Sequence, residues 1–222
     1  QQTRHASRRC ATGGFFVAHM DRLVHEHGLT RDEMVKIVKE HVVGFESEPT
    51  TAALCAVNMI LRGDGSTKIE AEDSLRAKSF PTGKANVSLM NPPFPHKQTD
   101  TPVEDFIDRG LEGLVKGGKL AVIVPQSLLS KSSKGPWRER LLKKNSLIAV
   151  CQLPDELFQP YAAATTSALV FEKGTPQAKT VETVFVRLNH DGLALKKGVR
   201  IARPDELNSI PEAIQAVHGK KV

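Results

Sequence analysis

The residues best suited to chemistry form the run Asn91-Pro92-Pro93-Phe94, which directly follows an apolar stretch at 85–90. Proline lacks a backbone N–H and fixes φ, so the chain must leave an expected strand here in a stiff, extended turn. The Asn91 side chain and the Pro92 carbonyl then offer two oxygen acceptors, which suit the two hydrogens of an exocyclic amine. Phe94 offers an aromatic face on which the base bearing that amine can stack. Taken alone, the run is equally consistent with a structural turn.

A second run, from Cys10 to Phe15, reads Cys-Ala-Thr-Gly-Gly-Phe and places two glycines just before an expected helix. Glycine lets a backbone approach a ligand closely, and the start of a helix exposes free amide groups. The run lacks the glycine spacing of the dinucleotide fingerprint, so a dinucleotide is a poor fit. Without further context, the start of a helix explains these glycines better than a binding loop does.

Two acids follow expected strands. Glu46 ends a strand predicted over 42–46, where a carboxylate beside a glycine-rich loop can accept hydrogens from two ribose hydroxyls. Asp73 follows the next expected strand, where it could accept from an adenine amine. Each acid also has a simpler interpretation: Glu46 as a charge favoured by the dipole of the helix that begins at Pro49, and Asp73 as a solvated loop residue.

Short β-like runs alternate with helical stretches, which predicts a parallel sheet with crossover helices. Helices are expected over 15–28, 32–40 with Thr30 as the N-cap, 49–61, 103–115 ending at Gly117-Gly118, and 136–144. Strands are expected over 42–46, 67–71, 85–90, 119–124, 147–153 and 166–172. Residues 181–188 and the region of Gly192 suggest a hairpin-like tail, and a polar helix is expected from Pro204. In doubly wound sheets, ligands bind at the carboxyl ends of the strands.

The composition describes a globular protein with 222 residues, 40% hydrophobic and 25% charged, which suits one domain with a small extension. The apolar runs are too short to span a bilayer, and the basic N-terminal residues carry no secretory signal. A net charge of +6 favours a polyanionic partner, although a merely basic protein fits equally well. The basic helix expected over 136–144 leaves the same choice between phosphate contacts and a solvated face.

Three scattered cysteines, Cys10, Cys55 and Cys151, form neither a disulfide framework nor a metal-ligand spacing, which predicts a cytoplasmic protein. The eight histidines show no paired ligand spacing, so no metal site is expected. The sequence also lacks a Gly-x-Ser-x-Gly elbow and a phosphate loop ending in Gly-Lys-Ser/Thr.

The chemical motifs occur in a characteristic order. They are Cys10–Phe15, Gly44-Phe45-Glu46, Ala56–Leu61, Asp73-Ser74-Leu75, Asn91–Phe94, Gly117–Pro125, Leu153-Pro154-x-x-Leu157-Phe158 and Thr165–Phe171. Over about residues 10–175 this order resembles the modification subunit of type I restriction–modification systems, a family of N6-adenine DNA methyltransferases. The resemblance implies an α/β fold of class I S-adenosylmethionine-dependent methyltransferases, with a Rossmann-like, doubly wound sheet.

The same resemblance implies roles for individual residues. Thr12, Gly13 and Gly14 would lie near the methionine part of the cofactor S-adenosylmethionine, Glu46 would take its ribose and Asp73 its adenine amine. The full cofactor-binding set is expected to be Cys10, Thr12, Gly13, Gly14, Phe15, Glu46, Asp73 and Asn91, and the catalytic set Asn91, Pro92, Pro93 and Phe94. The catalytic residues would hold a target adenine flipped out of the duplex while the methyl group passes to its N6 nitrogen, without a metal. Expected partners are duplex DNA, a specificity subunit and a motor-nuclease subunit.

The sequence departs from the family at three places. Ser7-Arg8-Arg9 replaces a hydrophobic strand and Asp-Pro, Ala11 replaces a glycine, and Ala85-Asn86 replaces Phe-Asp. We therefore expect the central first strand to be missing, with an N-terminally incomplete catalytic domain over 1–175 and an extension with a hairpin and a helix over 176–222. One alternative is a catalytically impaired fragment or remnant with the same fold. Another is a methyltransferase that acts on an RNA guanine or a protein glutamine.

Overall fold

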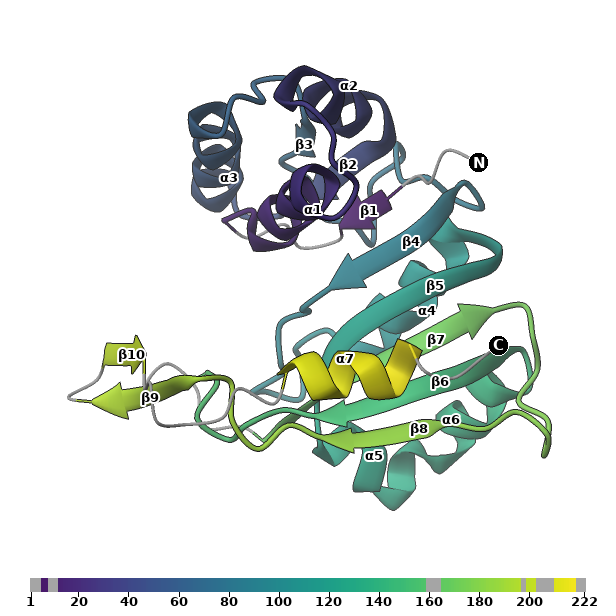
Figure 1. Cartoon of the computed structure of the whole chain (residues 1–222). Coiled ribbons are helices and arrows are strands. Elements are labelled where there is room, and N and C mark those ends of the chain that lie inside the picture. Colours follow the sequence, from purple (N-terminus) through teal and green to yellow (C-terminus); the bar gives the residue numbers. More distant parts are fainter. Residues whose placement is uncertain (1–4, 8–11, 159–164, 197–198, 203–209, 219–222) are drawn as a thin grey trace. The chain divides into compact units, whose positions relative to one another are not determined.

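The computed structural model of this chain describes residues 5–7, 12–158, 165–196, 199–202 and 210–218. The chain folds as two compact units, 1–121 and 122–222. Both units combine helices with strands of a mixed β-sheet, whose elements are labelled in Figure 1. In the described part of the chain, no helix is long and apolar enough to cross a membrane.

The sheet of the first unit has the strand order β3-β2-β1-β4-β5. Its strands are β1 (His5–Ser7), β2 (Val42–Phe45), β3 (Lys68–Glu70), β4 (Ala85–Met90) and β5 (Leu114–Pro125), the last of which runs across the division between the units. β1 pairs in parallel with both β2 and β4, and β2 pairs in parallel with β3. The order thus grows outward from β1 in both directions, as in a doubly wound sheet.

β1 overturns the expectation that the first strand is missing. Its three residues pair with 42–44 of β2 on one side and with 87–89 of β4 on the other. The prediction was wrong because it required an apolar run, whereas ladder hydrogen bonds use backbone N–H and C=O groups whatever the side chain. A central strand of only three residues leaves no hydrophobic pattern that periodicity can detect.

Three helices of the first unit are α1 (Gly14–His25), α2 (Arg31–His41) and α3 (Pro49–Leu61), and each confirms a predicted helix within a few residues. The predicted cap of α2 is a reciprocal capping box. The Thr30 hydroxyl accepts from the Glu33 N–H at 3.4 Å, and the Glu33 carboxylate accepts from the Thr30 N–H at 2.9 Å. Proline begins α3, where its missing N–H costs nothing.

The fourth helix, α4 (Val103–Gly113), ends two residues earlier than predicted. A Cβ on Gly113 would lie 2.9 Å from the ring of Phe80, so glycine allows the helix end to pack closely there. Leu114 is fully buried and already extended, and it begins β5. Gly117 and Gly118 therefore lie inside β5 rather than at a helix end, and Gly117 has a φ of 78°.

The core of the first unit lies between α1, α2, α3 and β2. Its buried cluster consists of Phe16, Met20, Met34, Val38, Val42, Cys55 and Met59. The predicted inner face of the first helix is confirmed at Phe16 and Met20. A second cluster is formed by Phe45, at the end of β2, and by Ala77 and Phe80, which belong to the segment that follows β3. These two clusters support the segments that follow β2 and β3.

The second unit continues with the strand order β5-β7-β6-β8. Its elements are α5 (Ser127–Ser130), a 3-10 turn at Ser132–Lys134, α6 (Gly135–Leu142), β6 (Asn145–Gln152), β7 (Thr166–Lys173), β8 (Val184–Arg187), β9 (Leu193–Lys196), β10 (Val199–Ala202) and α7 (Ile210–His218). β6 is antiparallel to β7 and parallel to β8, α6 packs against β6, and α7 packs against β8 (Figure 1). β9 and β10 form a separate antiparallel ribbon just after Gly192, whereas residues 184–187, predicted as part of a hairpin-like tail, pair as β8 with β6. The predicted domain boundary at 175 stays a prediction.

Candidate functional site

The strand order places the main motifs at one edge of the sheet. β1 and β4 are parallel neighbours at the point where the order reverses, and ligands of doubly wound sheets bind beyond the carboxyl ends of such strands. Asn91 directly follows β4, and Glu46 directly follows β2. Ser7 lies in register with Gly44 and Leu89, so Glu46 and Asn91 each stand two positions beyond the same row. Two strand spacings put their backbones about 10 Å apart.

The glycine loop is built tightly against α3. Gly13 is the N-cap of α1 and has a φ of 93°, a conformation that favours glycine. A Cβ there would lie 3.0 Å from Met59 Cε and 3.2 Å from Cys55 Sγ. The Asn58 side chain donates to the Thr12 carbonyl at 2.8 Å, which ties the loop to the same helix. Cys10, also predicted at this site, lies outside the described residues.

The other predicted loop residues lie more openly. Thr12 and Gly14 are exposed, and Phe15 is half-buried. Among the described residues, a Cβ on Gly14 would meet no atom within 4 Å. No side chain caps α1, and its first turn carries no acidic residue. Among the described residues, the amide groups at this helix start therefore have no capping side chain and no competing carboxylate of their own helix.

Glu46 is a buried carboxylate with only 1% of its surface exposed. Its side chain accepts from the Glu48 N–H at 3.2 Å, and its own N–H donates to the Glu70 carbonyl at 3.0 Å. Glu46 is not the N-cap of the following helix, and its simpler interpretation as a charge favoured by that helix's dipole stays a prediction. Glu48 is the N-cap instead: its carboxylate accepts from the Thr51 and Thr50 N–H groups at 2.5 and 3.1 Å, and hydrogen bonds from Thr51 and Thr50 lower the pKa of Glu48.

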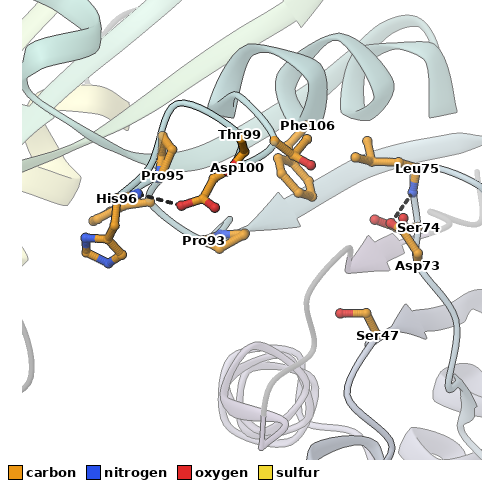
Figure 2. Close-up of a pocket in the computed structure, with 12 residues that line it drawn as sticks. Ser47, Asp73, Ser74, Leu75, Pro93, Pro95, His96, Thr99, Asp100 and Phe106 are labelled. Atoms are coloured by element: carbon orange, nitrogen blue, oxygen red, sulfur yellow. Dashed lines mark hydrogen bonds between the residues drawn. The ribbon is translucent and has the colours of Figure 1, made fainter.

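Asp73 and the turn after β4 line one pocket of about 570 Å³ within the first unit. Ser47 and the segment Asp73-Ser74-Leu75 form part of the lining, together with Pro93, Phe94 and the loop that follows (Figure 2). Asp73 accepts from the Leu75 N–H at 3.0 Å and lies 3.8 Å from the exposed Arg76 guanidinium. The structure thus brings Asp73 together with Pro93 and Phe94 of the turn, whereas Glu46, Asn91 and Pro92 are not in the described lining. The residues of 12–15 are not in the described lining of this pocket.

The Asn-Pro-Pro-Phe turn is anchored at its start and open at its end. Pro92 is buried, Asn91 and Phe94 are half-buried, and Pro93 is exposed on the pocket side. Anchoring of Pro92 fixes the backbone that carries the two candidate oxygen acceptors. Chemically, the arrangement can present two acceptors and an aromatic face to a planar amine.

The loop after this turn contains pocket residues that the sequence did not reveal. Figure 2 shows the Asp100 carboxylate beside the His96 backbone, and it accepts from the N–H groups of His96 and Lys97 at 2.8 and 2.9 Å. The N–H groups of Lys97 and, second, His96 hold the pKa of Asp100 below its usual value. This carboxylate therefore fixes the loop that forms one pocket wall. Ser47 and Phe106 also line the pocket without a preceding sequence signal, because their positions depend on the fold.

Two other predicted features have outcomes outside this pocket. On α6, Arg138 donates to the carbonyls of Leu128 and Lys131 at 3.0 and 2.9 Å, so at least this basic side chain holds the local backbone. In the described residues, Cys55 and Cys151 form no disulfide, and burial raises the pKa of Cys151. The same part of the chain contains no group of three or more His, Cys, Asp or Glu side chains that could hold a metal ion.

Comparison with known proteins gives consistent matches. A family model described as N-6 DNA Methylase matches residues 6–221. The type II restriction enzyme and methyltransferase RM.BcgI of Heyndrickxia coagulans is 29% identical over 198 residues, 86% of this chain and 31% of that protein. The type I restriction enzyme EcoEI methylase subunit of Escherichia coli is 26% identical over 183 residues, 75% of this chain and 37% of that protein. The chain thus spans about a third of the length of these relatives.

Solved structures give the same fold. A structure from Listeria monocytogenes, assigned to the class I S-adenosylmethionine-dependent methyltransferases, aligns with a TM-score of 0.67 at 16% identity. The alignment covers 98% of this chain and 64% of that one. The predicted α/β class I fold is therefore confirmed, together with its doubly wound sheet around β1.

Proposed function

This chain belongs to the N-6 DNA methylase family, and on that premise we propose that it carries the catalytic site for adenine-N6 methylation of DNA. The observation that supports this most directly is the position of Asn91–Phe94. The turn follows β4 at the point where the strand order reverses, and its Pro93 and Phe94 line a pocket with Asp73. Relatives carry names such as type I restriction enzyme methylase subunit, and we propose the role of modification subunit for the protein that contains this chain.

S-adenosylmethionine is the cofactor that class I methyltransferases use, and when bound it supplies a methyl group carried on a positively charged sulfur. The residues present fit it. The open space beside Gly14 and the uncapped start of α1 suit a carboxylate-bearing amino acid, and we assign this end to Thr12, Gly13, Gly14 and Phe15. The predicted Cys10 completes that set.

The two acids suit the nucleoside end. The Glu46 carboxylate stands at the end of β2, the position suited to ribose hydroxyls, and because only 1% of it is exposed, binding would require that it be uncovered. Asp73 lines the pocket with 43% of its side chain exposed, so its carboxylate is accessible to an adenine amine. We propose these two roles because both acids follow parallel neighbouring strands, which places them at one edge of the sheet.

Asn91 and Pro92 would hold the target amine. An amine conjugated into an aromatic ring is a poor nucleophile, because its lone pair is delocalised. If the Asn91 side chain and the Pro92 carbonyl accept both N–H hydrogens, the nitrogen moves toward tetrahedral geometry and its lone pair becomes available. Phe94, half-buried after the rigid Pro92-Pro93 pair, would stack on the flipped base. Catalysis then depends mainly on positioning.

Partners and location follow from the same proposal. We propose duplex DNA as the substrate, with a specificity subunit and a motor-nuclease subunit as partners, because the relatives include type I restriction enzyme methylase subunits. The cysteine pattern supports a cytoplasmic location. The impaired-remnant alternative loses its main support, since β1 is present and paired on both sides.

The test is S-adenosylmethionine binding to the 222-residue chain by calorimetry, followed by transfer of labelled methyl to duplex DNA. We expect micromolar binding that Gly13→Asp abolishes and Asn91→Ala retains. We also expect label in N6-methyladenine, which Asn91→Ala should eliminate. A folded chain that binds no S-adenosylmethionine would support the remnant alternative. Label transferred to RNA guanine or to protein glutamine, in competition with DNA, would contradict the proposed substrate.

A further inference from the structure

Arg109, on α4, is held by several hydrogen bonds and by an aromatic ring. Its Nε donates to the Ser74 carbonyl at 3.2 Å, and one Nη donates to the Ala77 carbonyl at 3.1 Å. The other Nη donates to Glu112 at 2.8 Å. The guanidinium carbon also lies 4.3 Å from the centre of the Phe80 ring. Only 19% of the Arg109 side chain is exposed, so its two carbonyl bonds are partly buried, whereas the bond to Glu112 is exposed.

The two carbonyl acceptors belong to the segment that carries Asp73. Within it, the Asp73 carbonyl accepts from the Arg76 and Ala77 N–H groups at 2.9 and 2.8 Å, which makes a tight turn. Ser74 and Ala77 are both buried, at 4% exposure each. Arg109 therefore extends from α4 and donates to carbonyls near both ends of this turn.

Lysine could not do the same. A guanidinium is planar and presents five N–H donors in a fixed fork, which allows simultaneous bonds to two carbonyls and a carboxylate. Its flat face also stacks on an aromatic ring such as Phe80. An ammonium group has three donors on a flexible stem and cannot satisfy this arrangement from one position.

We propose that Arg109 is a positioning residue, which holds the 73–77 segment so that Asp73 is set for the planar amine of a bound nucleoside. This inference rests on the proposed function, since the nucleoside in question is that of S-adenosylmethionine. Asp73, Ser74 and Leu75 all line the pocket, and the Asp73 carboxylate accepts a hydrogen bond from the Leu75 N–H. A shift of the Ser74 carbonyl would therefore move the Asp73 carboxylate directly.

The central test compares Arg109→Met with the wild-type chain. Methionine keeps most of the apolar packing over Phe80 but loses all the donors. We expect S-adenosylmethionine affinity to fall about tenfold, the scale of one lost hydrogen bond to a charged group, here from the adenine amine to the displaced Asp73 carboxylate. The KM for S-adenosylmethionine should rise by the same factor, whereas the KM for DNA and kcat should change less than about twofold. If kcat fell and the affinities for S-adenosylmethionine and DNA weakened to the same extent, the cause would be general destabilisation, and the proposal would be overturned.

A second readout does not depend on any ligand. Arg76 lies within the held segment and its side chain is 90% exposed, so trypsin can report on local opening. We expect cleavage after Arg76 to accelerate in Arg109→Met at temperatures well below the melting midpoint. Unchanged cleavage together with unchanged affinity would overturn the proposal.

Matched controls separate the individual contacts. Glu112→Gln removes the ion pair but leaves the two carbonyl bonds, so affinity and cleavage should stay within about twofold of wild type. Arg22→Met removes an arginine from an exposed pair with Glu26 and should also leave both readouts unchanged. If Arg109→Met fails to fold, Arg109→Lys provides the same test. We expect it to weaken S-adenosylmethionine binding and to accelerate cleavage after Arg76 in the same direction, but by less. If the wild-type chain binds no S-adenosylmethionine, the proposed function and the ligand role fail together, and the cleavage assay still decides whether Arg109 holds the segment.

Discussion

Gly13→Ala should destabilise the chain through its backbone and its neighbours at once. A left-handed φ costs an L-residue about 1–2 kcal/mol, and Gly13 has a φ of 93°. The new methyl group would also lie 3.0 Å from Met59 Cε and 3.2 Å from Cys55 Sγ. Met59 Cε ends a flexible side chain and can yield by a few tenths of an ångström, so overpacking adds about 1 kcal/mol. We expect a total loss of about 2–3 kcal/mol.

The matched control is Gly14→Ala, one residue along the same loop. Gly14 is the first residue of α1, and a Cβ there would meet no described atom within 4 Å. Alanine favours a helix more than glycine does, so this change should be neutral or stabilising by up to about 1 kcal/mol.

Thermal unfolding followed by circular dichroism provides the measurement. For a chain of this size, the loss at Gly13 should lower Tm by about 5–10 °C, whereas Gly14→Ala should not lower it. Urea unfolding of the same variants would give the difference in free energy directly. If both variants unfold within about 0.5 kcal/mol of wild type, the loop does not hold its left-handed conformation against α3, and the reasoning fails.

Two further predictions concern hydrogen bonds described above. Thr30→Ala removes the cap of α2 and should cost about 1 kcal/mol in urea unfolding, and Thr30→Ser should restore most of it; equal stability of the alanine variant would contradict the capping box. The backbone N–H groups of Lys97 and, second, His96 lower the pKa of Asp100 below 3.8, so the ionised form is the one that the fold stabilises. Protection of those two amides from hydrogen exchange, corrected for intrinsic rates, should persist from pH 7 to about pH 4 and disappear only as pH falls through the lowered pKa. Loss of protection already at pH 6 would contradict this.

Local signals in the sequence predicted most helices well. α3 begins at Pro49, as predicted from its proline, and α2 follows the Thr30 cap. Such signals act within one helical turn, so they are visible without the fold. The end of α4 was misplaced because it depends on the contact between Gly113 and Phe80, which are far apart in the sequence.

The residues of the candidate site also divide into those that local signals predicted and those whose roles depend on the fold. Asn91 follows β4 as predicted, because a strand and a double proline are both local signals. Asp100 could not be predicted, since its role arises only when the loop folds back on its own amides. Arg109 was also invisible, because its acceptors are backbone carbonyls more than thirty residues away. The binding roles of the site residues themselves remain predictions for the experiments above.

The shortness of β1 has a thermodynamic consequence. Among the described residues, β2 and β4 are joined in the sheet only through the three residues of β1, so few of these ladder bonds must break for the two sides of the first unit's sheet to separate. Such an opening would separate Glu46 from Asn91, which stand at the ends of β2 and β4. A ligand that contacts both Glu46 and Asn91 binds only the sheet in which β2 and β4 stay joined through β1. By mass action, such a ligand raises the free energy of opening. If the proposed ligand binds there, β1 would thus couple occupancy of the site to the integrity of the sheet.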